Sequence, residues 1–250
     1  MRNVIAVSIL LTCTTVLSAQ DLMMVTKTRV GDTENNLKSQ STTYMTTNLS
    51  RTNDSANGID ILIDYQKGIT YSINHKARTI TFTKASDLPG LAAYVKAHAP
   101  AGKGMDAFNA RMNDMYGDPG IFKVESIGKE VLLGRSCNKV RITSGNQIME
   151  YSVDPSLKSP VDPARMAQVA GSSYSRLAGY PRAAKVMANL MTATANLKGV
   201  ALKIHESGVI DMEVTSIRQG SIPASTFVLP AGYAMKDQIA ETEKRMAAHH

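Results

Sequence analysis

The stretch that decides the fold is residues 59–84, "IDILIDYQKGITYSINHKARTITFTK". Apolar and polar side chains alternate in three short runs within it, and a period of two is typical of strands in a sheet with one buried face. Turn signals at Lys67-Gly68 and at residues 74–77 separate the runs, and another at Asn57-Gly58 precedes the first run. Turns of this kind join neighbouring antiparallel strands, so the stretch predicts a meander of hairpins.

The alternation also divides each run into an apolar and a polar side. Asp60 and Asp64 are expected on the solvated side of the first run. The apolar residues expected on the buried side of the three runs are Ile59, Ile61, Ile63, Tyr65, Ile69, Tyr71, Ile73, Ile80 and Phe82.

Strands and helical stretches alternate in groups along the rest of the chain. Strands are expected from Leu22 to Phe82, and the period becomes helical at residues 86–116 with a break at 99–104. The later elements expected are strands within residues 121–153, helices from Asp162-Pro163 through Met191, a hairpin at 200–217, an extended piece at 225–230 and a charged helix at 235–250. No Gly/Ser or Pro linker divides the chain, so one α+β domain is predicted at residues 20–234.

Residues 1–19 have the three parts of a secretory signal peptide. Arg2 supplies the positive end, residues 4–17 are mostly apolar, and small residues precede the expected cleavage after Ala19. Cleavage there would place the mature protein in the periplasm or outside the cell. A second reading makes Cys13 a lipid anchor, but no small residue directly precedes it. A third reading, an uncleaved anchor helix, needs about 20 apolar residues.

Composition limits the class of partner. Apolar residues make up 43% of the 250 residues and charged residues 20%, which is typical of a globular protein. The net charge of +7 is dispersed, with no basic cluster, so nucleic acid is not an expected partner. A basic surface outside the cytoplasm favours anionic lipid or polysaccharide, and a merely solvated surface is the alternative. No later apolar run is long enough to span a membrane.

Motifs that carry catalysis or bind cofactors are missing from the sequence. Residues 101–107, "AGKGMDA", contain G-x-G-x-x-A but follow a helical pattern instead of a strand, so a helix-breaking loop is the better account. No G-x-S-x-G is present, and His75, His98 and His205 are too dispersed to form a metal-binding motif. Cys137 is the one cysteine after residue 19; a buried free thiol is expected, and a disulfide to another chain is the alternative. We predict no catalytic residue, metal or cofactor.

Methionines offer the clearest hint of a ligand. The chain has 14, and many lie in the two expected helical regions. A flexible, polarisable side chain can repack around varied apolar ligands, although methionine also fills gaps in ordinary cores.

Three segments together resemble an uncharacterised family of secreted bacterial proteins, similar to the periplasmic lipoprotein carriers and their outer-membrane receptor. They are "IDYQKGITYSINHKARTITF" at 63–82, "LLGRSCNKVRI" at 132–142 and "IPASTFVLPAGY" at 222–233. The resemblance covers most of the chain from about residue 21 to 233. It implies a strongly curved antiparallel sheet, a half-open barrel, with helices covering the concave apolar face. In the carriers that face accepts acyl chains, whereas the function of the similar family is unknown.

These observations predict a non-enzymatic periplasmic or secreted protein that binds a hydrophobic or lipidated ligand, such as a lipid or a lipidated protein, in the concavity of the sheet. The alternative is a protein-interaction or stress-sensing module of the cell envelope with a closed core. The residues expected to line the concavity are Ile61, Ile63, Tyr71, Ile73, Phe82, Phe108, Met112, Met187 and Met191.

Overall fold

The computed structural model describes residues 20–30, 37–97, 103–117, 121–162, 164–166, 169, 180–206 and 210–247. The expected signal peptide, His98 and much of the helical stretch expected from Asp162 lie outside these residues. Nothing in the fold bears on them.

The described strands form a single sheet in the order β12-β6-β5-β4-β3-β2-β1-β11-β10-β9-β8-β7. Neighbouring strands are antiparallel except for β12 and β6, which are parallel. The strands are β1 (Leu22–Val30), β2 (Leu37–Met45), β3 (Leu49–Asp54), β4 (Ile59–Asp64), β5 (Ile69–Asn74), β6 (Thr79–Lys84), β7 (Lys123–Leu132), β8 (Arg135–Ser144), β9 (Gln147–Asp154), β10 (Val200–Glu206), β11 (Ile210–Gln219) and β12 (Ala234–Asp237).

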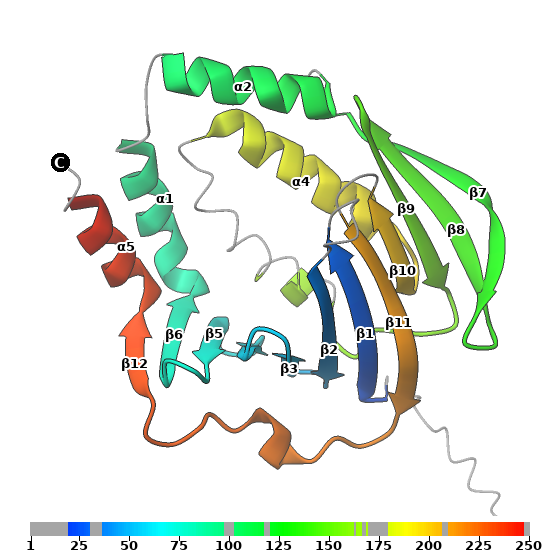
Figure 1. The fold of residues 1–250 in the computed structure, drawn as a ribbon, viewed down its shortest axis with the longest axis horizontal. Coiled ribbons are helices and arrows are strands. Elements are labelled where there is room, and N and C mark those ends of the chain that lie inside the picture. Colours follow the sequence, from blue (N-terminus) through cyan, green and yellow to red (C-terminus); the bar gives the residue numbers. More distant parts are fainter. Residues whose placement is uncertain are drawn as a thin grey trace, which may run out of the picture.

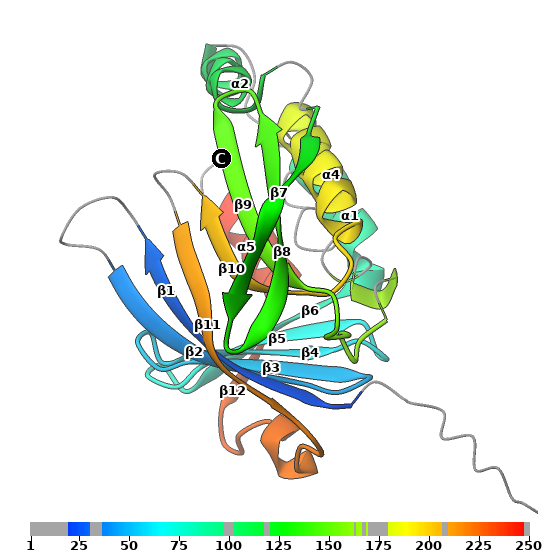
Figure 2. The same ribbon diagram turned by 90° about the vertical axis from the view of Figure 1, so that its right-hand side faces the viewer.

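The sheet is strongly curved and open, and helices lie across its concave side (Figures 1 and 2). In Figure 1, β3–β6 form a floor, while β1 and β7–β11 rise at the right. The helices are α1 (Leu88–Ala97), α2 (Lys103–Tyr116), α4 (Pro181–Ala195) and α5 (Gln238–Ala247), with short 3-10 helices η1 (Ala85–Asp87) and η3 (Ala224–Phe227). The predicted α+β architecture is confirmed, and the parallel pair is an addition to it.

Helix α4 packs on the rising half of the sheet. Its buried Ala193 and half-buried Leu190 contact Ile142 of β8 and Met149 of β9. Helix α2 lies beside α4, where the rings of Phe108 and Tyr180 have centroids 4.7 Å apart. In the described part of the chain, no helix is both long and apolar enough to cross a membrane.

The register of the floor strands shows which side chains share a face. Residues directly opposite each other in an antiparallel pair project to the same side. Leu62 lies opposite Tyr71, and Tyr71 lies opposite Phe82. Ile61 and Ile63 of the same strand are paired with Ser72 and Thr70 instead, and therefore project to the other side.

The convex face of the floor is covered by the strap, residues 220–237, which runs from β11 to the edge of the sheet (Figure 1). Phe227 of the strap packs with the buried Leu62, Ile73 and Ile80. The sequence predicted an extended piece at 225–230, but its first residues belong to η3. Pro223 fixes a φ of −58° just before the turn, and its carbonyl accepts the N–H of Thr226 at 3.0 Å, which favours the 3-10 turn.

The charged C-terminal helix starts later than residue 235. Residues Ala234–Asp237 form β12, and α5 begins at Gln238. The carboxylate of Asp237 accepts the backbone N–H of Ile239 at 2.8 Å, and an aspartate in this position caps the first turn of a helix. The cap and the pairing of β12 with β6 set the boundary, and the apolar pattern alone could not locate it.

Candidate functional site

A stripe of isoleucines on the concave face of the floor is the first candidate site. Ile59, Ile61 and Ile63 of β4 are all half-buried and point away from the strap. Hydroxyl-bearing residues flank the stripe on the same face, because the register places Ser50, Thr52, Thr70, Ser72, Thr81 and Thr83 beside it. The floor is therefore an apolar track between polar borders, whereas the resemblance implied a concave apolar face.

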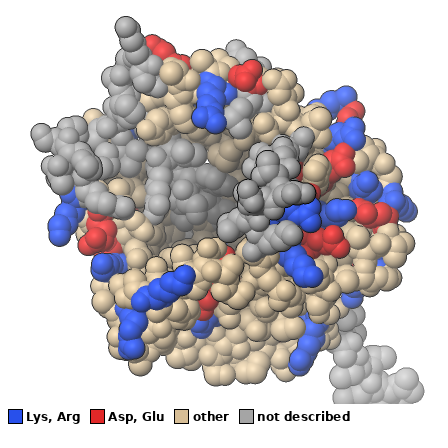
Figure 3. All heavy atoms as spheres, viewed as in Figure 1, with Lys and Arg blue, Asp and Glu red and all other residues tan. Residues whose placement is uncertain are grey.

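This stripe faces the middle of the molecule, between the sheet and the helices. Figure 3 shows a hollow in the surface on this side of the molecule, inside the frame that β3–β6, α1, α4 and β1 make in Figure 1. The two faces of β4 thus differ: Leu62 is 3% exposed beneath the strap, while its three isoleucines remain half-buried. The strap covers the convex side of the strand, whereas the isoleucines on its concave side keep part of their surface exposed.

The structure separates the sequence-predicted lining residues of the floor into two groups. Ile61 and Ile63 project into the concave side, but Tyr71, Ile73 and Phe82 project to the convex side. Ile73 is fully buried beneath the strap, and Tyr71 packs against the same cluster. The prediction that all five share one face is wrong, because alternation shows the two sides of each strand but not which side matches that of the next strand.

The predicted helical residues lie on the two helices that cross the concave side. Phe108 and Met112 belong to α2, and Met187 and Met191 belong to α4. All four side chains are half-buried. Helix α4 turns other residues toward the sheet, so its methionines lie beside its packed face. The ring of Phe108 contacts the ring of Tyr180, just before α4.

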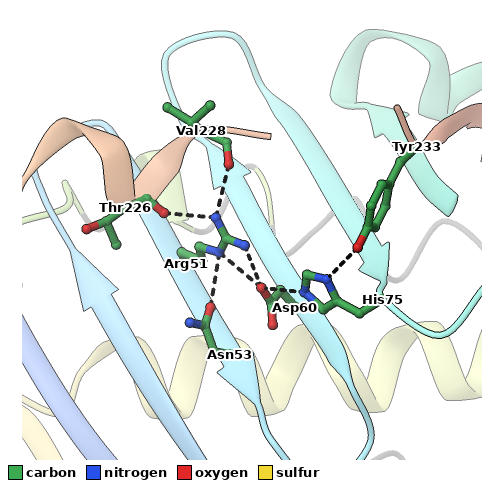
Figure 4. Close-up of polar contacts among 7 residues, drawn as sticks. All are labelled: Arg51, Asn53, Asp60, His75, Thr226, Val228 and Tyr233. Carbon is green, nitrogen blue, oxygen red and sulfur yellow. Dashed lines mark hydrogen bonds and ion pairs between the residues drawn. The ribbon is translucent and has the colours of Figure 1, made fainter. Parts of the chain in front are cut away.

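A polar cluster under the strap is the second candidate, shown in Figure 4. Arg51 of β3 donates from Nη2 to Oδ2 of Asp60 at 2.6 Å, and His75 donates from Nε2 to the same oxygen at 2.9 Å. Nδ1 of His75 lies 3.0 Å from the hydroxyl of Tyr233. Arg51 also donates from Nη1 to the carbonyls of Thr226 and Val228, at 2.9 and 3.1 Å. We call these side chains, Arg51, Asp60, His75 and Tyr233, the clamp.

The clamp has the bonding pattern of a structural tie. Arg51 uses all three of its nitrogens as donors, with Nε shared between Asn53 and Asp60. The side chain of Asp60 is only 8% exposed, so its charge is held by two donors away from water. The two ring nitrogens of His75 are engaged by Asp60 and Tyr233, and among the described residues no His, Cys, Asp and Glu groups could hold a metal. The clamp therefore attaches the strap to the floor of the sheet.

Sequence reasoning missed the clamp because Asp60 lies in a strand with regular alternation. The pattern placed it on the solvated side of the first run, and a single strand carries no sign of what covers that side. The one usable signal was distant: "IPASTFVLPAGY" at 222–233 is rich in apolar residues and would need a surface to cover.

Cys137 is a free thiol and is fully buried. Burial raises its pKa, and the nearby carboxylate of Asp154 adds to the effect. Burial also acts on Asp154, but hydrogen bonds from Ser156 and Arg135 outweigh it and lower the pKa of this carboxyl. Cys137 therefore stays protonated and unreactive, as a buried small hydrophobe would.

A third feature is a polar pocket of about 710 Å³ on the rising half of the sheet. None of the predicted lining residues contributes to it. Charged side chains of both signs line it, and Lys27 and Lys203 both lie opposite Glu213. Such mixed charge on neighbouring strands is typical of a solvated surface. The lining residues are Lys27, Thr28, Arg29, Ser39, Gln40, Lys203, Asp211, Met212, Glu213 and Thr215.

Comparison with known proteins gives distant structural matches. No curated protein matches the chain. An uncharacterized conserved protein from Thermus thermophilus is 10% identical with a TM-score of 0.46, over 89% of this chain and 92% of that one. The LolA superfamily protein NE2245 from Nitrosomonas europaea is 9% identical with a TM-score of 0.32, over 84% and 90%. PNGF-II is 10% identical with a TM-score of 0.44 over 91% of this chain, which spans only 32% of PNGF-II.

One family description matches the sequence itself. The domain of unknown function DUF4412 matches residues 105–233, from α2 through most of the strap. The match covers just over half of the 250 residues, and the chain therefore belongs to the DUF4412 family.

Proposed function

We propose that this protein is a non-enzymatic binding protein that holds a hydrophobic or lipidated ligand in the hollow on the concave side of its sheet. The observation that carries the proposal is the isoleucine stripe of β4. Its three side chains are half-buried and face the hollow, while the convex side of the same strand is closed by the strap.

The physical argument rests on the apolar surface that the isoleucines still expose. Apolar area removed from water contributes about 25 cal/mol per Å² of free energy, so covering these half-buried side chains is favourable. The strap supplies that cover on the convex face through Phe227. An apolar track with polar borders, left open on the concave face, suits an elongated ligand with an apolar body. Helices α2 and α4 carry half-buried methionines, whose flexible side chains would adapt to such a ligand.

The cellular setting belongs to the same proposal. We place the mature protein, beginning near Gln20, in the periplasm or outside the cell after removal of residues 1–19. Residues 20–234 would act as one binding domain, followed by the charged C-terminal helix. A lipid or a lipidated protein is the ligand class that fits an envelope location.

Binding of an apolar dye tests the proposal directly. We expect N-phenylnaphthylamine to bind with increased fluorescence, and Ile61→Asp to weaken binding at least about tenfold because it places a charge in the apolar track. Met112→Lys should act in the same direction from the α2 side. Val228→Asp is the matched control, since Val228 is 63% exposed on the strap and its substitution should leave dye binding unchanged.

A native mass spectrum of protein purified gently from its own envelope adds a second readout. Extra mass that dissociates as lipid would support the carrier function. Bare polypeptide, together with dye binding that Ile61→Asp leaves intact, would reject it and favour the interaction module with a closed core.

A further inference from the structure

The turn between β7 and β8 presents apolar side chains to solvent. Val131 is 71% exposed and Leu133 is 47% exposed, whereas Leu132 between them packs against the core cluster that contains Cys137. The inward leucine anchors the turn, and its two neighbours point outward. We call residues 131–134 the tip.

The backbone of the tip is unfavourable for a leucine. Leu133 has a φ of +53° and Gly134 a φ of +72°, so both lie in the left-handed region of a two-residue hairpin turn. Glycine, asparagine and aspartate are the residues that adopt this conformation at low cost, and a bulky side chain is disfavoured there. The turn between β3 and β4 follows the rule, because its left-handed position, with a φ of +64°, is occupied by Gly58. Leu133 thus lowers the stability of the turn while contributing little to packing. A contact between its exposed side chain and another surface would explain why a leucine occupies this position.

The exposed charge beside the tip is positive. Lys129 is exposed and forms no ion pair in the described part of the chain. Among the acidic neighbours, Asp154 is 1% exposed and paired with Arg135 at 3.0 Å, and Glu130 is half-buried and accepts a hydrogen bond from the hydroxyl of Ser152. An approaching surface would therefore meet two apolar side chains and the exposed ammonium group of Lys129 before either carboxylate.

We propose that the tip inserts Val131 and Leu133 into an anionic phospholipid surface. The turn lies at the outer end of the β7–β8 hairpin, away from the helices (Figures 1 and 2). A protruding apolar turn suits a surface that yields around two side chains, and a neighbouring cation adds attraction to anionic headgroups. This membrane contact goes beyond ligand binding in the hollow and involves none of the residues proposed for it.

Co-sedimentation of the purified protein with vesicles tests the proposal. We expect binding to phosphatidylglycerol vesicles, and weaker binding to phosphatidylcholine and at high salt. The double variant Val131→Asp with Leu133→Asp should lose at least about tenfold in affinity. Ile121→Asp is the matched control, because Ile121 is also 71% exposed but precedes β7 at the opposite end of the hairpin, and its binding should stay within about twofold of the unmodified protein.

A gentler variant keeps the test valid if the double variant does not fold. Leu133→Asn relieves the left-handed backbone and should raise the midpoint of thermal unfolding while weakening vesicle binding. Absence of phosphatidylglycerol binding, an equal loss in Ile121→Asp, or full binding by Leu133→Asn would each overturn the proposal. Self-association that disappears in the double variant would do so as well, by showing that a second copy covers the tip. Dye binding in the hollow should be unchanged in all tip variants, which separates this test from that of the proposed function.

Discussion

Asp60 is the residue on which the clamp depends. Its carboxylate neutralises Arg51, whose side chain is 12% exposed, and removal of one partner of a buried pair leaves the other charge uncompensated. We expect Asp60→Ala to lower the free energy of unfolding by about 3–5 kcal/mol in urea denaturation. Lys67→Ala removes an exposed partner of Asp64 and should cost no more than about 1 kcal/mol, so equal losses in the two variants would contradict the role of the clamp.

The backbone conformation at residue 199 requires glycine, whereas residue 90 has room for a side chain. Gly199 has a φ of +121°, and a Cβ there would overlap the carbonyl of Asp154 and lie 2.9 Å from Cα of Pro155. Gly199→Ala should therefore destabilise the protein by on the order of 3 kcal/mol. Gly90 in α1 has open space around it, so Gly90→Ala should stabilise by about 0.5–1 kcal/mol. Thermal unfolding of both variants decides, and a shift of the same sign in both would contradict the prediction.

Glu206 makes stability depend on pH. Burial raises its pKa in the folded protein, so the folded state holds this proton more tightly than the unfolded chain. That contribution is fully present below the unfolded pKa, about 4.3, and is lost as the pH rises through the folded pKa. The difference in unfolding free energy between Glu206→Gln and the unmodified protein should therefore be more favourable to the variant at about pH 8 than at about pH 4. Unfolding midpoints at the two pH values measure this difference, and no change between them would refute it.

At the scale of elements, local pattern was a good guide to strands and a poor guide to faces. The period of two and the turns at Asn57-Gly58 and Lys67-Gly68 predicted β4 and β5 within a residue or so. The side on which Tyr71 and Phe82 lie depends on register with β4 and on cover by the strap, which lies far along the chain at residues 220–237. Alternation contains no information about either.

Phe227 fixes the strap as an element. It is 9% exposed among Leu62, Ile73 and Ile80, and a buried phenylalanine contributes about 3–5 kcal/mol relative to alanine. We expect Phe227→Ala to loosen the strap more than the sheet, and so to speed tryptic cleavage after the exposed Lys236 at least about tenfold. Val228→Ala, at a 63% exposed neighbour, should leave the cleavage rate unchanged. Cleavage that is equally fast in both variants would contradict a role for the side chain of Phe227.

At the scale of the whole molecule, the sheet carries different cover on its two faces. The strap closes the convex side of the floor and ends by pairing β12 with β6 in parallel, while α4 packs on the concave side of β8 and β9. The resemblance to the lipoprotein carriers implied the curved sheet and the covering helices. The parallel pairing of residues 79–82 with 234–237 could not be predicted, because two strands so far apart along the chain show no local sequence pattern of their pairing. Among the described residues, the strap and α4 thus cover opposite faces in different halves of the sheet.

A ligand that spans this hollow would couple residues that the described contacts do not join. Ile61 lies on the floor and Met112 on α2, so their substitutions should act independently unless the same ligand touches both. We expect Ile61→Asp and Met112→Lys, combined in one chain, to lower dye affinity by less than the sum of their separate effects, with a coupling of about 1 kcal/mol or more. Ile61→Asp combined with Val228→Asp should be additive within about 0.5 kcal/mol. Additivity in the first pair would mean that the ligand rests on the floor alone, and that the methionines of α2 serve packing.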